Sequence, residues 1–203
     1  MKTKKQRKRQ TRHKRKKHSR TKSVFPKIVI SVPHSNPNGD GDRYSLQHAR
    51  NLKRTFREST RMFIHRGLRR RGVSDANRVF TPWKSLMRMY EKIAEKGSPS
   101  MAIDVHSFDE VPPKWNVPKD SQLVVMAEGS NYELLQTIHC PFPVIKGAKD
   151  NRNIVRARIH NIPALLLEFK GVPLDSPELY TKISQFCKRY HQLYLKKYGR
   201  PFI

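Results

Sequence analysis

Residues whose side chains can bind a metal or move a proton stand at the ends of three apolar segments. The run IVISVP ends at His34, the run AIDV ends at His106, and the run PALLL ends at Glu168. In an open α/β sheet, ligands gather outside the carboxyl ends of the strands, so these side chains would project into one crevice. Two imidazoles with nearby carboxylates are what a catalytic zinc site needs, because such zinc takes three protein ligands and keeps one position open.

Each of these residues also has an ordinary structural explanation. A single histidine after a strand commonly serves as a hydrogen-bonded loop residue, and Glu168 could cap the helix that follows it. Asp40 and Asp42, in the loop HSNPNGDGD after the first apolar run, could be turn residues, since Asp and Asn favour turns. The coincidence at three strand ends favours a shared metal site over these separate explanations.

Strands and helices alternate along the sequence and would position these residues. Short apolar runs predict strands at 27–32, 101–108, 122–127, 143–147 and 163–169. Helical periodicity and capping residues predict helices at about 44–71, 81–96, 131–138 and 177–198. This alternation implies βαβ units and predicts a three-layer α/β/α fold with a mainly parallel mixed sheet.

Basic charge is concentrated at the N-terminus but is not confined to it. The 203 residues include 43 Lys and Arg against 16 Asp and Glu, a net charge of +27. Residues 1–22 hold 13 of the basic residues and no acid, which leaves +14 for residues 23–203. We therefore expect a disordered basic arm at 1–22 and one α/β domain at 23–203, because like charges without apolar residues cannot offset their ordering entropy. Such an arm would bind nucleic acid or another polyanion nonspecifically, through salt-dependent phosphate contacts.

Several classes of protein do not match this composition. No run of about 18 apolar residues is present to span a bilayer, and the basic N-terminus lacks the apolar stretch of a secretory signal. Cys140 and Cys187 are too few for a disulfide framework and lack the spacing of a zinc knuckle. Ser35 and Ser107 lie outside any GxSxG elbow of a serine hydrolase. We expect an intracellular protein, cytoplasmic or nuclear, with no membrane partner; a virus particle is a further setting for so basic a chain.

Three ordered motifs resemble those of a known enzyme family. VPHSNP (32–37), IDVHSF (103–108) and PALLLEF (163–169) are similar to the VPHSG, IDxHS and PxxxLE signatures of N-formylglutamate amidohydrolases. These enzymes belong with poly-γ-glutamate hydrolases and, more distantly, with zinc carboxypeptidases. The order and spacing agree from about residue 27 to 200. The resemblance implies a phosphorylase/hydrolase-like fold and a zinc enzyme in which His34 and His106 are metal ligands.

The third metal ligand is the point at which the sequence departs from zinc carboxypeptidases. Those enzymes carry a glutamate three residues after the first histidine, where this chain has Pro37. The loop NGDGD should therefore supply the ligand, and its Gly39 and Gly41 give it the freedom to turn back toward that histidine. We prefer Asp42, because it starts the next helix as the family's acidic residue does, and Asp40 remains the alternative.

Two further carboxylates complete the expected site. In the resemblance, Glu168 matches the carboxylate that activates the water on the metal. Asp104 lies two residues before His106, and we expect its side chain on the opposite side of a regular strand. Even so, it could reach a ligand histidine from outside the ligand set and fix which ring nitrogen carries the proton.

Arginines just before the third motif are expected to set the choice of substrate. NIVRAR (153–158) resembles the family's substrate-facing segment, and we expect Arg152, Arg156 and Arg158 to bind the substrate. A guanidinium binds a carboxylate through two parallel hydrogen bonds, although in so basic a chain these could be ordinary surface cations.

The sequence thus predicts a zinc-dependent amidohydrolase. Its substrate would be an amide that carries a carboxylate, such as an N-acyl amino acid or a glutamyl peptide. Zinc would polarise the amide carbonyl, and Glu168 would move the proton. The alternative is a non-catalytic protein that keeps the fold and binds nucleic acid or another polyanion, for which the net charge of +27 is the main argument.

Overall fold

The structure, a computed structural model, describes most of the chain beyond residue 26. The described residues are 27–34, 42, 44–56, 60–64, 84, 87, 88, 91, 100–149, 151–173 and 176–199. The arm expected at 1–22 and its boundary with the domain lie outside these residues, as does nearly all of the helix expected at 81–96. The two-part organisation of the chain therefore stays a prediction.

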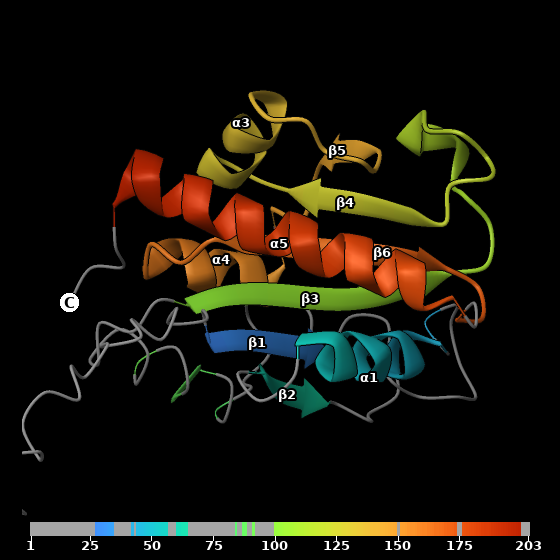
Figure 1. Cartoon of the computed structure of the whole chain (residues 1–203), viewed down its shortest axis with the longest axis horizontal. Helices are drawn as coiled ribbons and strands as arrows, with labels where there is room; N and C mark the ends of the chain where they lie inside the picture. Colours follow the sequence, from blue (N-terminus) through green and yellow to red (C-terminus); the bar gives the residue numbers. More distant parts are fainter. Residues whose placement is uncertain are drawn as a thin grey trace, which may run out of the picture.

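Six strands form one mixed, mainly parallel sheet (Figure 1). They are β1 (Lys27–Val32), β2 (Thr60–Ile64), β3 (Ser100–Phe108), β4 (Leu123–Ala127), β5 (Val144–Lys146) and β6 (Ala164–Lys170). Their spatial order is β2-β1-β3-β6-β4-β5. The first four of these are parallel to one another, whereas β4 is antiparallel to β6 and parallel to β5. The predicted mainly parallel mixed sheet is confirmed.

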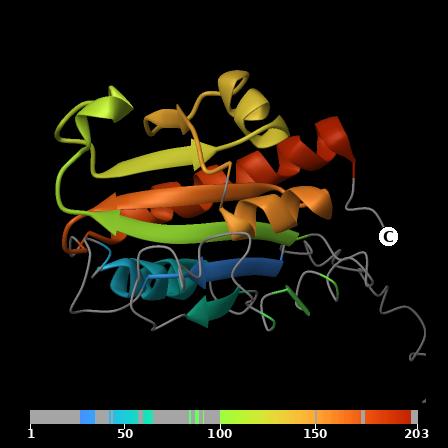
Figure 2. The same ribbon diagram turned by 180° about the vertical axis from the view of Figure 1, so that it is seen from behind.

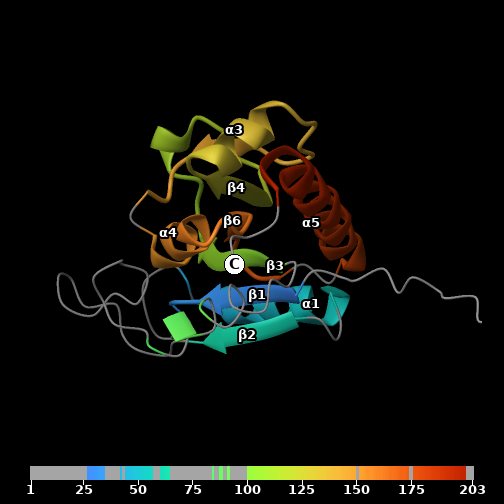
Figure 3. The same ribbon diagram turned by 90° about the vertical axis from the view of Figure 1, so that its left-hand side faces the viewer.

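Helices cover both faces of this sheet. The helices are α1 (Ser45–Phe56), α3 (Ser130–Gln136), α4 (Arg152–Ile159) and α5 (Pro177–Tyr198), with a short 3₁₀-helix, η2 (Pro113–Trp115). The larger apolar core joins one face to α1, α3 and α5, and a smaller core joins the other face to α4. Figure 2 shows the α4 side, and Figure 3 shows α4 and α5 on opposite sides of β3 and β6. The fold therefore has the three layers that the sequence predicts.

The central strands are buried on both faces because their sequences are almost continuously apolar. Side chains alternate along a strand, so Ile28 and Ile30 of β1 join the larger core while Val29 joins the smaller one. Small side chains make room for α4 on its face of the sheet, where Ala102 and Ala164 lie in the same core as its Ile154. No helix in the described part of the chain is long and apolar enough to cross a bilayer.

Two elements differ from the sequence prediction. The helix expected at about 44–71 is shorter, because α1 ends at Phe56 and β2 begins at Thr60. Phe56 and Phe63 are seven residues apart, which equals about two helical turns, so an apolar pair in two different elements matches the helical period. The helix α4 was not predicted at all. The predicted strands corresponding to β1, β3, β4, β5 and β6 are confirmed, as are the helices α3 and α5.

Candidate metal centre

Three buried side chains that could hold a metal ion gather at the carboxyl ends of β1 and β3. His34 follows β1, Asp42 precedes α1, and His106 lies near the end of β3. One ligand atom from each residue lies within 4.8 Å of the other two. All three residues are at most 6 % exposed. Of the two acids that the sequence left open, Asp42 lies in this cluster, and Asp40 lies outside the described residues.

The carboxylate of Asp42 is the centre of the cluster. Its Oδ2 lies 2.6 Å from Nδ1 of His34 and 3.4 Å from Nδ1 of His106. Its Oδ1 accepts a hydrogen bond of 2.8 Å from the backbone N–H of Ser107. The hydroxyl of Ser45, the first residue of α1, donates to the carbonyl of His34 at 2.9 Å. These bonds hold the end of β1, the start of α1 and the end of β3 around one point.

The cluster is electrostatically suited to a cation. Burial by itself would raise the pKa of Asp42, but attraction to His106 and hydrogen bonds with both imidazoles lower that pKa well below its ordinary value. Burial by itself would lower the pKa of His106, yet Asp42 and Asp104 together raise it well above 6.5. Two buried carboxylates thus favour positive charge at this point. A metal ion bound here would replace the proton on His106, because an imidazole must be neutral to act as a ligand.

Asp104 bonds to the far side of the His106 ring. Nε2 of His106 lies 3.0 Å from Oδ2 of Asp104, so Nδ1 is the ring nitrogen that faces Asp42. The expectation that Asp104 lies on the opposite side of the strand is wrong, because residues two apart in a regular strand share a face. The expected contact of Asp104 with His106 is present.

Ser31 and Asn151 hold Asp104, and neither is among the site residues that the sequence predicts. The Ser31 hydroxyl donates to Oδ1 of Asp104, and the side-chain amide of Asn151 donates to Oδ2 at 2.5 Å. Ser31 is paired in register with Asp104 across β1 and β3. A serine inside the apolar run KIVISV is a visible signal, since a buried hydroxyl requires a partner.

Glu168 stands beside the cluster on the neighbouring strand β6. It is paired in register with His106 across two parallel strands, so both side chains leave the same face of the sheet. Burial raises the pKa of Glu168 to about 7; the positive charge of His106 opposes this shift, and the carboxylates Asp42 and Asp104 add to it. A carboxyl group with such a pKa can accept and release a proton near neutral pH, which general acid–base catalysis requires.

The three arginines expected to bind substrate all lie on α4, at increasing distance from its start. Asn151, the N-cap of α4, contacts Asp104, so the helix begins beside the candidate metal centre with Arg152 as its first residue. The Nε of Arg156 is buried and has no hydrogen-bond partner among the described residues. Cδ of Arg158 lies 3.7 Å from the position that a Cβ on Gly129 would take.

Gly129 marks the edge of the sheet opposite the metal centre. It follows β4. Because β4 is antiparallel to β6, the carboxyl end of β4 lies beside the amino end of β6. The structure therefore places Arg158 away from the metal centre, and Arg152 at the end of α4 nearest to it.

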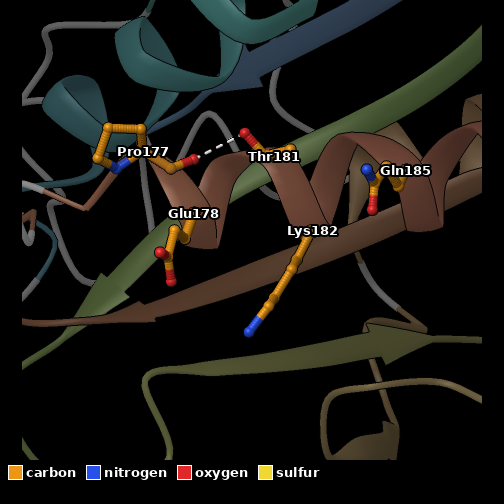
Figure 4. A pocket seen from close by; sticks show the side chains of 5 residues that line it. All are labelled: Pro177, Glu178, Thr181, Lys182 and Gln185. Atoms are coloured by element: carbon orange, nitrogen blue, oxygen red, sulfur yellow. Dashed lines mark hydrogen bonds between the residues drawn. The ribbon is translucent and has the colours of Figure 1, made fainter.

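A shallow hollow elsewhere on the molecule follows one side of α5 (Figure 4). The residues that line it are Pro177, Glu178, Thr181, Lys182 and Gln185. The Thr181 hydroxyl donates to the carbonyl of Pro177 at 2.8 Å, within the helix itself. No residue of the metal centre lines this hollow, so it is a feature of the helix surface rather than part of the candidate site.

Comparisons with known proteins bear on the fold. The structure is similar to the crystal structure of gene product Atu2144 from Agrobacterium tumefaciens, with a TM-score of 0.53, 13 % identity, and coverage of 86 % of this chain and 92 % of that one. A mutant of murine aminoacylase 3 matches with a TM-score of 0.41 and 11 % identity, over 88 % of this chain and 66 % of that one. No family model and no curated protein matches the sequence. The likeness to Atu2144 supports the α/β fold alone.

Proposed function

We propose that the protein is a zinc-dependent amidohydrolase that cleaves an amide bond in a carboxylate-bearing substrate. The observation that carries this proposal is the buried cluster of His34, Asp42 and His106, with Glu168 beside it. Two imidazole nitrogens and one carboxylate oxygen, all within 4.8 Å of one another, form a donor set that zinc prefers. The burial of these groups at a strand edge matches the setting of catalytic sites in open α/β sheets.

His34, Asp42 and His106 would hold the zinc ion. When bound, zinc supplies Lewis-acid chemistry that polarises a carbonyl and lowers the pKa of water. Asp104 accepts the hydrogen from Nε2 of His106 and thereby leaves the lone pair of Nδ1 for the ion. In this arrangement His34, Asp42 and His106 are the metal ligands, and Glu168 is not a ligand and can transfer protons.

Glu168 is proposed as the general acid–base. Its carboxylate takes a proton from the attacking water, whose oxygen forms the new bond to the amide carbon. The same carboxyl group then gives that proton to the leaving nitrogen as the C–N bond breaks, so the products are a carboxylic acid and an amine. Burial is the main cause that raises the pKa of this carboxyl group above its ordinary value.

The substrate would be an N-acyl amino acid or a glutamyl peptide. Arg152 starts α4 at the end nearest the metal centre, and Arg156 lies one turn further along. A guanidinium there would bind a substrate carboxylate through paired hydrogen bonds. The net charge of +27 attracts anionic substrates in general.

The non-catalytic alternative is not favoured, because binding a polyanion at the surface does not require a costly buried group of charges. Nonspecific nucleic-acid binding through residues 1–22 stays a prediction from charge, since that segment lies outside the described residues.

The proposal is tested on the full-length protein. Elemental analysis should find about one zinc ion per chain, and the protein should hydrolyse N-acyl-glutamates or glutamyl peptides. A chelator should abolish hydrolysis, and added zinc should restore it. A protein that binds no zinc and cleaves none of these amides would contradict the proposal.

A further inference from the structure

Asn151 joins the start of α4 to the metal centre and does more than cap a helix. We propose that Asn151 is a positioning residue that fixes the orientation of His106 by holding Asp104. This inference rests on the proposed function, because it assigns a role in holding the zinc ligand. It also goes beyond it, since Asn151 is neither one of the three proposed ligands nor the proposed proton carrier.

Asp104 is held by donors from three different elements. Oδ2 of Asp104 accepts from the amide Nδ2 of Asn151 at 2.5 Å and lies 3.0 Å from Nε2 of His106. Its Oδ1 accepts from the hydroxyl of Ser31 on β1. Asp104, Ser31 and Asn151 are all at most 4 % exposed. Three hydrogen bonds to its two oxygens fix the plane of the Asp104 carboxylate. A carboxylate fixed in this way also fixes the orientation of the His106 ring that it contacts.

Of these donors, only Asn151 lies outside the six strands of the sheet. Ser31 is placed by the register of β1 against β3, and His106 lies on the same strand as Asp104. Asn151 instead follows β5 and reaches the sheet from the loop before α4. Its position therefore depends on how that loop and helix are anchored.

The turn before α4 fixes the position of the Asn151 side chain. The backbone N–H of Asn151 donates to the carbonyl of Ala148 at 2.9 Å. Ala148 has a φ of 72°, a left-handed conformation that is costly for a residue with a Cβ. Such a conformation persists only where its surroundings determine it. Ala148 packs against the smaller core, which ties this turn to the α4 face of the sheet.

The identity of residue 151 is explained by two simultaneous demands. Oδ1 of Asn151 accepts from the backbone N–H of Ile154, which makes it the N-cap of α4. Ser, Thr, Asp and Asn all serve well as N-caps. Aspartate has no hydrogen to donate to Asp104, and a serine or threonine hydroxyl is a single atom that would have to serve both partners. Asparagine has a separate acceptor for the helix and a separate donor for the carboxylate.

The two functions of Asn151, as N-cap of α4 and as donor to Asp104, can be separated by substitution. Asn151→Ser and Asn151→Thr keep a good N-cap but lose the amide donor to Asp104. The zinc affinity of the full-length protein, measured by competition with a chromogenic chelator, should fall about 10–100-fold in both variants. Circular dichroism should show that both variants remain folded. In the cobalt-loaded protein, the visible absorption bands should shift, because His106 would no longer be held in one orientation.

A matched control is another buried asparagine. Asn131 in α3 accepts from the backbone N–H of Ala164 and from the hydroxyl of Tyr190, at the sheet edge away from the metal centre. Asn131→Ser should lower the unfolding temperature and leave zinc affinity unchanged.

The failure of this inference can be told apart from that of the proposed function. A wild-type protein that binds no zinc would overturn the proposed function and the inference with it. A wild-type protein that binds zinc, together with Asn151→Ser and Asn151→Thr variants that bind it equally well, would overturn the role of Asn151 alone.

Discussion

His106 and Glu168 occupy the same register position on the neighbouring parallel strands β3 and β6. Adjacent strands lie about 4.8 Å apart, so a proposed metal ligand and a proposed proton carrier stand side by side on one face of the sheet. Two residues 62 positions apart in the sequence are thereby held on rigid backbone rather than on loops.

Removing either histidine of the cluster should remove the metal. His34→Ala and His106→Ala each delete one of three ligands, so the purified variants should lose most of their zinc by elemental analysis. Circular dichroism should show the fold retained, because both residues lie at strand ends outside the two apolar cores. Stoichiometric zinc in both variants would rule out this site.

The choice between the two loop acids can be tested in the same way. Asp42→Ala should weaken zinc binding strongly, because Oδ2 of Asp42 lies between the two imidazoles. Asp40→Ala is the matched control, since it removes the same charge two residues earlier and should bind zinc almost normally. The reverse order of affinities would assign the third ligand to Asp40.

Glu168→Gln should separate metal binding from catalysis. The substitution keeps the shape of the side chain but removes its ability to carry a proton, so zinc content should remain at the wild-type level. The rate of amide hydrolysis should fall by about 10²–10⁴-fold, which is the usual contribution of general acid–base catalysis. An unchanged kcat in a zinc-loaded variant would give Glu168 a structural role instead.

Two buried histidines should make the protein less stable in mild acid. His48 lies between the carbonyl of Gly171, at 2.8 Å from Nε2, and the hydroxyl of Tyr180, at 2.9 Å from Nδ1. Burial lowers the pKa of His48 to about 4, and it does the same for His191. Between pH 6.5 and 4 the unfolded chain therefore binds more protons at these sites than the folded protein. Their contribution to stability is complete above pH 6.5 and is lost as the pH falls toward 4.

The size of this effect can be measured on the full-length protein. The free energy of unfolding of the wild type should fall by about 3 kcal/mol more than that of His48→Gln between pH 6.5 and 4. His139→Gln, at an exposed position, should follow the wild type. Glu168 contributes to the pH dependence with the opposite sign, because its raised pKa makes the folded protein bind more protons than the unfolded chain over part of this range. This contribution is the same in the wild type and in His48→Gln, so it cancels when the two are compared. Parallel pH curves for wild type and His48→Gln would contradict the prediction.

Deleting residues 1–22 should separate polyanion binding from the candidate metal centre. The deletion removes 13 basic residues and none of the residues of the cluster. Zinc content and thermal stability should barely change. Binding to nucleic acid should weaken, and the slope of log affinity against log salt should flatten because fewer counterions are released. Equal slopes for the full-length and the truncated protein would show that residues 1–22 are not the main polyanion contact. Loss of zinc or of folding on truncation would show that the domain begins before residue 23.

The sequence by itself determined five of the six strands of the sheet, all except β2, and the residues at the ends of three of them. Runs such as KIVISV and PALLLEF are apolar enough to be buried strands whatever the rest of the chain does. Because polar residues that follow such strands gather at one edge in an α/β fold, the expectation that His34, His106 and Glu168 belong together required only local patterns.

Tertiary structure alone decided which other residues support that edge. The contact of Asn151 with Asp104 joins residues 47 positions apart, and no local pattern of charge or hydropathy specifies it. The end of α1 at Phe56 and the formation of β2 also depend on pairing with β1, because an apolar pair seven residues apart fits two structures equally well. Register and loop anchoring are properties of the assembled sheet, so the contact of Asn151 with Asp104, and the end of α4 nearest the candidate metal centre, become visible only when the chain is folded.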